Sequence, residues 1–202
     1  MDNELEWDKM LKIRTSGRDD TDADQFRFPY EPTPYSVLER LANSGYIRKN
    51  NTLIDYGAGK GRVDFFLSYQ TRCHSIGVEY NERIFNALEE NKSTSAAGRR
   101  TDFVLADAVK YDVPAEADRF YFFNPFSIEI LLSVIKKIKE SYYINQREML
   151  FFFYYPNKEY LAYLNSSDEM ELIDEISTID LFEGNDEREK IAVYRVTNFL
   201  GN

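Results

Sequence analysis

The segment LIDYGAGKGR, residues 53–62, decides the fold of this chain. Its apolar start predicts a short buried strand over residues 52–56, and GRVDFFLSYQ (61–70) predicts the helix that follows. Three glycines at alternate positions join the two elements: Gly57, Gly59 and Gly61. Because glycine has no side chain, such a turn lets a ligand approach the backbone closely at the N-terminus of the next helix. The segment therefore predicts a ligand-binding turn.

Strand-like and helical segments alternate from residue 33 onward. Thr33 and Pro34 are typical of a helix start, with threonine as the N-cap and proline at the first helical position. Asn81 and Asn157 are the expected N-caps of two later helices. Further strands are predicted at residues 75–80, 102–107, 119–124, 149–155, 171–182 and 190–196. This order predicts a doubly wound, mostly parallel α/β sheet that ends in a hairpin with one antiparallel strand.

The chain is expected to form one domain, because it has no internal repeat and no linker rich in glycine, proline or serine. We assign residues 33–202 to this domain and residues 1–32 to a partly flexible N-terminal leader. Cys73 is the only cysteine, which excludes an intrachain disulfide and indicates a reducing compartment. The longest apolar runs are far too short to cross a bilayer. A cytoplasmic protein that is not held in a membrane is therefore expected.

Two common phosphate-binding motifs do not fit the glycine turn. A P-loop requires G-x-x-x-x-G-K-[ST], but Ile54 stands at the first glycine position and Gly61 replaces the serine or threonine. The dinucleotide motif G-x-G-x-x-G requires a third glycine where Arg62 stands. The pattern is D-x-G-x-G-x-G instead. Its first residue, Asp55, would repel a diphosphate and attract the ammonium group of an amino-acid moiety.

Two more acidic residues stand at the ends of predicted strands. Glu79 ends the second strand, 22 residues after Gly57, where a carboxylate can accept hydrogen bonds from both hydroxyls of a ribose. Asp107 ends the third strand and is placed to accept from the exocyclic amine of an adenine, with Tyr80 against the base. The carboxyl ends of strands are the edge where open α/β sheets bind ligands. The pattern predicts an adenosine-containing ligand.

The chain thus resembles the class I methyltransferases that use S-adenosylmethionine (SAM). The resemblance covers about residues 33–200 and rests on DYGAGKG (55–61), GVEY (77–80) and LADA (105–108), followed by the late hairpin. It implies a seven-stranded sheet with an antiparallel last strand and SAM, as the cofactor, lying across the strand ends. It also implies that the three glycines line the methionine portion, that Glu79 holds the ribose, and that Asp107 with Ala108 reads the adenine.

The segment FFNPFS (122–127) follows the fourth strand and faces the methyl group in this fold. It is similar to the [DNS]-P-P-[YFW] motif of family members that methylate amino groups, with one proline in place of two. In that motif, the polar side chain and a backbone carbonyl accept hydrogen bonds from the target nitrogen. The resemblance implies that Asn124, Pro125 and Phe126 are catalytic and that the acceptor atom is a nitrogen. A purely structural turn with Ser127 as a helix cap is the alternative.

The aromatic segment FRFPYEPTPY (26–35) precedes the predicted domain. In such folds the preceding segment often covers the cofactor, so the candidates for a lid are Tyr30, Thr33 and Tyr35. Ordinary packing of the leader is the alternative. Arg62 is expected on the surface of the first turn of its helix. His74, beside Cys73, lies far from the reactive edge, and no metal site is predicted.

Direct methyl transfer from SAM, without a metal or a covalent enzyme intermediate, is the expected function. A SAM-binding regulatory module without turnover and a nicotinamide-dependent oxidoreductase are the alternatives. The formal net charge is −10, with 8 acids against 4 bases in residues 1–24 and 10 against 2 in residues 168–190. Because acidity repels phosphate backbones, a small-molecule or protein acceptor is favoured over RNA. Neither the acceptor nor the oligomeric state is encoded in a motif.

Overall fold

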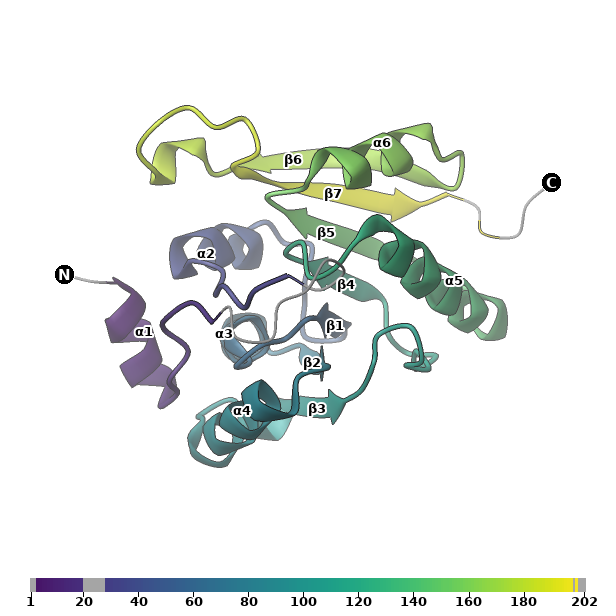
Figure 1. The fold of residues 1–202 in the computed structure, drawn as a ribbon. Helices are drawn as coiled ribbons and strands as arrows, with labels where there is room; N and C mark the ends of the chain where they lie inside the picture. Colours follow the sequence, from purple (N-terminus) through teal and green to yellow (C-terminus); the bar gives the residue numbers. More distant parts are fainter. Residues whose placement is uncertain (1–2, 20–27, 198, 200–202) are drawn as a thin grey trace.

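The strand of the glycine segment, β1 (Thr52–Tyr56), lies inside a seven-stranded sheet (Figure 1). The computed structural model describes residues 3–19, 28–197 and 199. The strand order is β3-β2-β1-β4-β5-β7-β6, and β7 is antiparallel to both of its neighbours. The other strands are β2 (His74–Glu79), β3 (Thr101–Leu105), β4 (Arg119–Phe122), β5 (Leu150–Tyr154), β6 (Met170–Ser177) and β7 (Lys190–Val196). The predicted seven-stranded, doubly wound sheet with a reversed strand in its final hairpin is confirmed.

Helices cover both faces of this sheet. The helices are α1 (Asn3–Leu11), α2 (Tyr35–Asn43), α3 (Arg62–Thr71), α4 (Glu82–Thr94), α5 (Ile128–Ile144) and α6 (Lys158–Ser166). Side chains from α1, α2 and α3 share one buried cluster with Leu53 of β1, whereas α5 and α6 share the other with Ile54. Successive side chains of a strand point to opposite faces, so β1 contributes to both clusters. Burial on both faces explains why β4 and β5 are almost uninterrupted apolar runs.

The helix starts differ in part from the sequence prediction. Asn81 and Asn157 are confirmed as N-caps, since their side chains accept hydrogen bonds from backbone N–H groups of α4 and α6. The prediction for Thr33 is wrong: α2 begins at Tyr35, and Pro34 precedes it without a side-chain cap. The Thr33 hydroxyl lies instead 3.0 Å from the hydroxyl of Tyr121 on β4. The hydroxyl that the pattern assigned to local capping therefore makes a tertiary contact.

The N-terminal leader contains helix α1, which packs on the domain. The Trp7 ring meets Phe66 of α3 edge-on at 4.8 Å, and its Nε1 donates to Glu39 of α2 at 2.8 Å. The leader is predicted to be partly flexible, and its residues 20–27 lie outside the described residues. No helix in the described ranges is long and apolar enough to span a membrane.

Candidate functional site

Two glycines of the turn, Gly57 and Gly59, adopt a backbone conformation that favours glycine, and both face other segments of the chain. Gly57 and Gly59 have positive φ angles, +77° and +57°. A Cβ on Gly57 would lie 2.6 Å from the Cβ of Pro125, and a Cβ on Gly59 would lie 2.2 Å from the ring of Tyr30. The turn is thus packed directly against the leader and the segment after β4. Gly61 is the N-cap of α3 and faces Phe65 rather than the same space.

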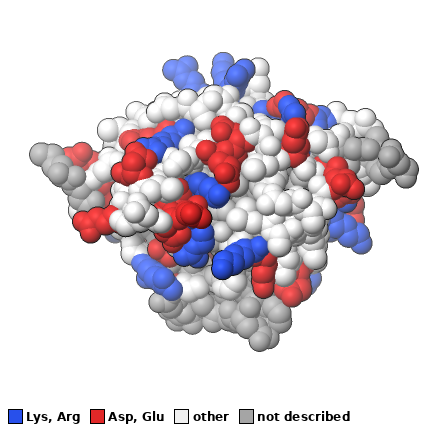
Figure 2. All heavy atoms as spheres, turned by 90° about the horizontal axis from the view of Figure 1, so that it is seen from above, with Lys and Arg blue, Asp and Glu red and all other residues white. Residues whose placement is uncertain are grey.

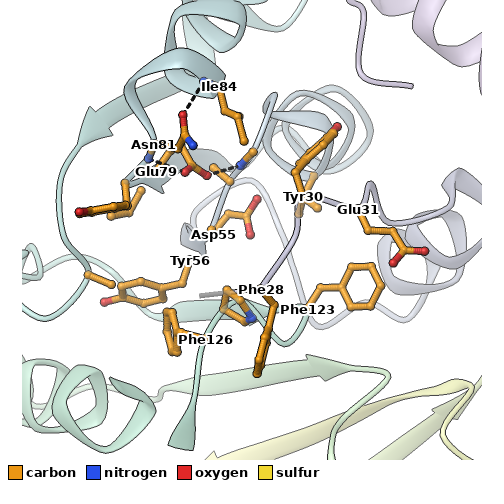
Figure 3. A pocket seen from close by; sticks show the side chains of 18 of the residues that line it. Phe28, Tyr30, Glu31, Asp55, Tyr56, Glu79, Asn81, Ile84, Phe123 and Phe126 are labelled. Atoms are coloured by element: carbon orange, nitrogen blue, oxygen red, sulfur yellow. Dashed lines mark hydrogen bonds between the residues drawn. The ribbon is translucent and has the colours of Figure 1, made fainter. Parts of the chain in front are cut away.

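A hollow opens at the carboxyl ends of β1, β2 and β4, and we call it the first hollow (Figure 3). Its empty volume is about 1080 Å³, including the solvent at its open mouth. The residues predicted from the sequence that line it are Asp55, Gly57, Gly59, Glu79, Tyr80, Asp107, Ala108, Pro125, Phe126, Tyr30 and Thr33. Gly61, Asn124 and Tyr35 are the predicted residues that do not line it.

Glu79 is fixed at the end of β2 with its carboxylate in the first hollow (Figure 3). One oxygen accepts from the backbone N–H of Gly59 and the other from that of Asn81, both at 2.8 Å. Burial raises the pKa of Glu79, and these N–H groups oppose the rise because they stabilise the charged form. Each oxygen keeps a lone pair, so the side chain can still accept hydrogen bonds from a ligand.

Asp55 is only 3% exposed and also faces the first hollow. Burial raises the pKa of this carboxyl well above its usual range, and the carboxyls of Asp64 and Glu79 raise it further. Two neighbouring carboxyl groups that are both buried stay close together most easily when one of them carries a proton. Asp64 was not among the residues predicted from the sequence, although an acid between Val63 and Phe65 in the first turn of α3 was a usable signal.

Asp107, Ala108 and Tyr80 line the part of the first hollow beyond Glu79. Asp107 is half-buried and accepts from the backbone N–H of Val109 at 3.2 Å, whereas Tyr80 is 56% exposed. Tyr56 lines the hollow as well, and within the described part of the chain its buried hydroxyl has no hydrogen-bond partner. This end of the hollow therefore combines an acid, an exposed ring and a buried hydroxyl.

Arg62 is buried, at 3% exposure, so the prediction of a surface position is wrong. Its Nε donates to the Thr15 hydroxyl at 2.7 Å, and the guanidinium lies 4.3 Å from the centre of the Tyr35 ring. It also forms an ion pair with Glu4 of α1 and lines the first hollow. The leader folds over the first turn of α3 and thereby buries a side chain that the isolated helix would expose.

Residues 28–33, which we call the strap, cross the first hollow. The Tyr30 ring packs on Gly59, and its hydroxyl donates to the Thr15 carbonyl at 2.5 Å. Tyr30 and Asp19 exchange two backbone hydrogen bonds of 3.0 Å, and the Phe28 N–H donates to the Pro125 carbonyl at 3.3 Å. Of the three lid candidates, Tyr30 and Thr33 face the hollow. Tyr35 does not, because its hydroxyl donates to Asp8 at 2.6 Å beneath the leader.

The Asn-Pro-Phe segment is divided between two hollows. Pro125 and Phe126 line the first hollow, whereas Asn124 lines a neighbouring one, which we call the second hollow. The Asn124 Nδ2 donates to the Tyr155 carbonyl at 2.6 Å, and its Oδ1 accepts from the Asn157 N–H at 3.2 Å. Asn124 has a φ of +40°, an uncommon conformation that these contacts hold in place. Its role in orienting an acceptor nitrogen remains a prediction.

The second hollow adjoins the first, and the two share Phe28, Pro29, Glu31, Pro32 and Phe123. Its other lining side chains include Tyr154, Tyr155 and Phe182, together with the carboxylate of Glu189. The Glu189 carboxylate accepts from the Tyr154 hydroxyl at 3.0 Å. Among the described residues, no group of three or more metal-binding side chains occurs here or elsewhere.

The fold is shared with solved methyltransferase structures. A protein from Pyrococcus horikoshii, proposed to be an RNA methyltransferase, superposes with a TM-score of 0.62 at 14% identity over 99% of this chain and 98% of its own. An RNA methyltransferase from Salinibacter ruber, solved with S-adenosylhomocysteine (SAH), gives 0.53 at 17% identity over 83% and 93%. A precorrin-6y C5,15-methyltransferase from Geobacter metallireducens gives 0.60 at 14% over 82% and 91%. No protein-family model and no curated protein sequence matches the chain.

Proposed function

We propose that this protein is an enzyme that transfers the methyl group of SAM to an amine nitrogen. The observation that carries the proposal is the convergence of Asp55, Glu79 and Asp107 on one hollow beside the glycine turn. The three acids fit the three polar parts of SAM: its ammonium group, its ribose hydroxyls and its adenine amine. The fold that the chain shares with a methyltransferase solved with SAH supports the same cofactor.

Bound SAM would supply a methyl group on a positively charged sulfur: the acceptor nitrogen would bond to the methyl carbon in line with the carbon–sulfur bond, which would break to leave SAH. The residues of this chain bind and orient the reactants. Gly57 and Gly59 give close access to the backbone, and Glu79 is fixed by two N–H groups before any ligand arrives. The strap covers the glycine turn through Tyr30 and limits the access of water. Positioning therefore supplies most of the catalysis.

The second hollow is the proposed entry for the methyl acceptor. It meets the first hollow beside Phe123, close to the Asn-Pro-Phe segment. Aromatic rings and the carboxylates of Glu31 and Glu189 line it, and both kinds of group attract a positively charged amine, which would lose a proton to solvent before its nitrogen lone pair attacks the methyl group. This lining supports a nitrogen acceptor independently of the similarity of Asn124–Phe126 to the amino-methylating motif.

A small molecule or a protein is the proposed acceptor class, in preference to RNA. The net charge of −10 disfavours a polyphosphate partner. Over the face formed by β6, β7 and α6, basic and acidic side chains are interspersed (Figure 2). On these strands Arg195 pairs with Glu171 at 2.6 Å, and Lys190 pairs with Glu175 at 2.5 Å. Bases that are neutralised in this way offer little attraction to a phosphate backbone.

Calorimetric titration of the full chain with SAH tests the cofactor assignment. We expect binding that Glu79→Ala weakens by more than tenfold, because the ribose would lose a charge-assisted hydrogen bond of about 1.5–3 kcal/mol. Glu89→Ala, which removes an exposed carboxylate from α4, is the matched control and should bind as the wild type does. NADH is the second ligand control. A folded protein that binds NADH but not SAH would contradict the proposal.

Transfer of a labelled methyl group from SAM to fractions of a cell extract tests turnover. We expect the label to appear in small amines or in protein. Ribonuclease treatment of those fractions should leave the label in place. Label that ribonuclease removes would contradict the proposed acceptor class and leave the cofactor assignment intact. SAH binding without label in any fraction would favour a regulatory module.

A further inference from the structure

A row of side chains crosses the sheet beneath the glycine turn, on the face that α3 covers. Asp55 of β1 lies in register with Gly77 of β2, and Gly77 with Phe103 of β3. Gly77 leaves a gap in this row. A Cβ there would lie 2.9 Å from Oδ2 of Asp64 and 2.7 Å from the ring of Phe103. The gap therefore accommodates the carboxyl of Asp64 next to that of Asp55.

Asp64 is fully buried in the first turn of α3. Its Oδ1 accepts from the Ser75 hydroxyl at 2.5 Å, while its buried Oδ2 has no hydrogen-bond partner among the described residues and lies at the Gly77 gap beside Asp55. The N-terminal turn of a helix favours a negative charge. These contacts place the charge of the pair on Asp64 and the proton on Asp55, which faces the first hollow.

We propose that Asp64 is a positioning residue that holds Asp55 through one shared proton, and that a ligand ammonium group displaces this proton when it binds beside Asp55. The inference rests on the proposed cofactor, because SAM and SAH both carry an ammonium group. When the ligand binds, Asp55 loses a proton to solvent, and its carboxylate then pairs with the ammonium group. Asp64 keeps its charge and its bond to Ser75 throughout.

Few other groups near the pair titrate between pH 6 and 9. Burial raises the pKa values of the Tyr30 and Tyr121 hydroxyls and of the Cys73 thiol, so these groups stay neutral. The Arg62 guanidinium forms ion pairs with Glu4 and Asp8 of α1. Glu79 is the remaining carboxyl near Asp55, and Glu79→Gln removes its titration.

Proton release during SAH binding tests the inference. Calorimetric titrations of the full chain, in buffers of different ionisation enthalpy, give the number of protons released at each pH. We expect close to one proton for the wild type near pH 7 and the same number for Glu79→Gln, despite its weaker binding. We expect fewer for Asp64→Asn, because its amide can donate to Asp55 and because the neighbouring carboxyl that raises the pKa of Asp55 is gone. The affinity of the wild type should rise with pH, since the bound state holds fewer protons, and that of Asp64→Asn should rise less steeply.

Infrared difference spectra of the wild type keep the test independent of how well the variant folds. We expect SAH to remove the stretching band of a protonated carboxyl. Binding without proton release and without loss of this band would overturn the inference and leave the proposed function standing. A folded wild-type chain that binds no SAH would overturn the proposed function, and the inference with it.

Discussion

Replacing Gly59 by alanine should disconnect the strap from the glycine turn. Gly59 has a φ of +57°, and an alanine in that conformation is disfavoured by about 1–2 kcal/mol. The added Cβ would also lie 2.2 Å from the Tyr30 ring, so that the strap must move. Overpacking of this kind costs about 1–3 kcal/mol. We expect Gly59→Ala to lower the free energy of unfolding by about 2–5 kcal/mol.

Gly45→Ala is the matched control for backbone strain. Gly45 has a φ of +80°, but nothing lies within 4 Å of the position that its Cβ would take. It should therefore show only the strain of about 1–2 kcal/mol. In the double variant Gly59→Ala, Tyr30→Ala the added Cβ no longer meets a ring, so the loss of unfolding free energy due to overpacking should disappear. A double-mutant cycle measures this difference as a coupling energy.

Thermal unfolding and calorimetric SAH titration of these variants provide the measurement. For a chain of this size, 1 kcal/mol corresponds to about 2–4 °C in Tm. We expect the largest loss of Tm and of SAH affinity in Gly59→Ala. The reasoning is refuted if Gly59→Ala is no less stable than Gly45→Ala, or if removal of the Tyr30 ring leaves the effect of Gly59→Ala unchanged.

Three further predictions concern the supports of the site. Asn81→Ala removes a side chain that accepts hydrogen bonds from two N–H groups of α4, so urea unfolding should show a loss of stability of about 1 kcal/mol. The control Asn86→Ala, inside the same helix, should leave the stability unchanged. Arg62→Met leaves the buried carboxylate of Asp8 without its cation and should cost about 3 kcal/mol; unchanged stability would contradict the anchoring role. Burial raises the pKa values of both Asp55 and Asp64, so the folded pair holds a proton that the unfolded state releases near pH 4. The stability of the wild type should therefore fall from pH 4 to 7, relative to Asp64→Asn, by about 1.4 kcal/mol per pH unit for each retained proton, and parallel pH profiles would contradict this.

Local sequence patterns were sufficient for the sheet and for its ligand-binding edge. The apolar run of β1, the asparagine caps and the unbroken alternation of strands and helices follow from short-range preferences, which tertiary contacts do not override here. A parallel sheet brings the carboxyl ends of β1 and β2 together, so the convergence of Asp55 and Glu79 on one edge could be predicted without coordinates.

Contacts between distant segments decided the rest. The burial of Arg62 depends on Glu4 and Thr15, which lie 58 and 47 residues away along the chain. The Thr33 hydroxyl meets Tyr121 rather than its own helix, 88 residues away, and Asn124 is turned toward the start of α6. Asp64 approaches Asp55 only because Gly77 leaves space on the neighbouring strand. Periodicity and motif spacing describe one element at a time, whereas protonation and side-chain orientation depend on every element that packs around a group.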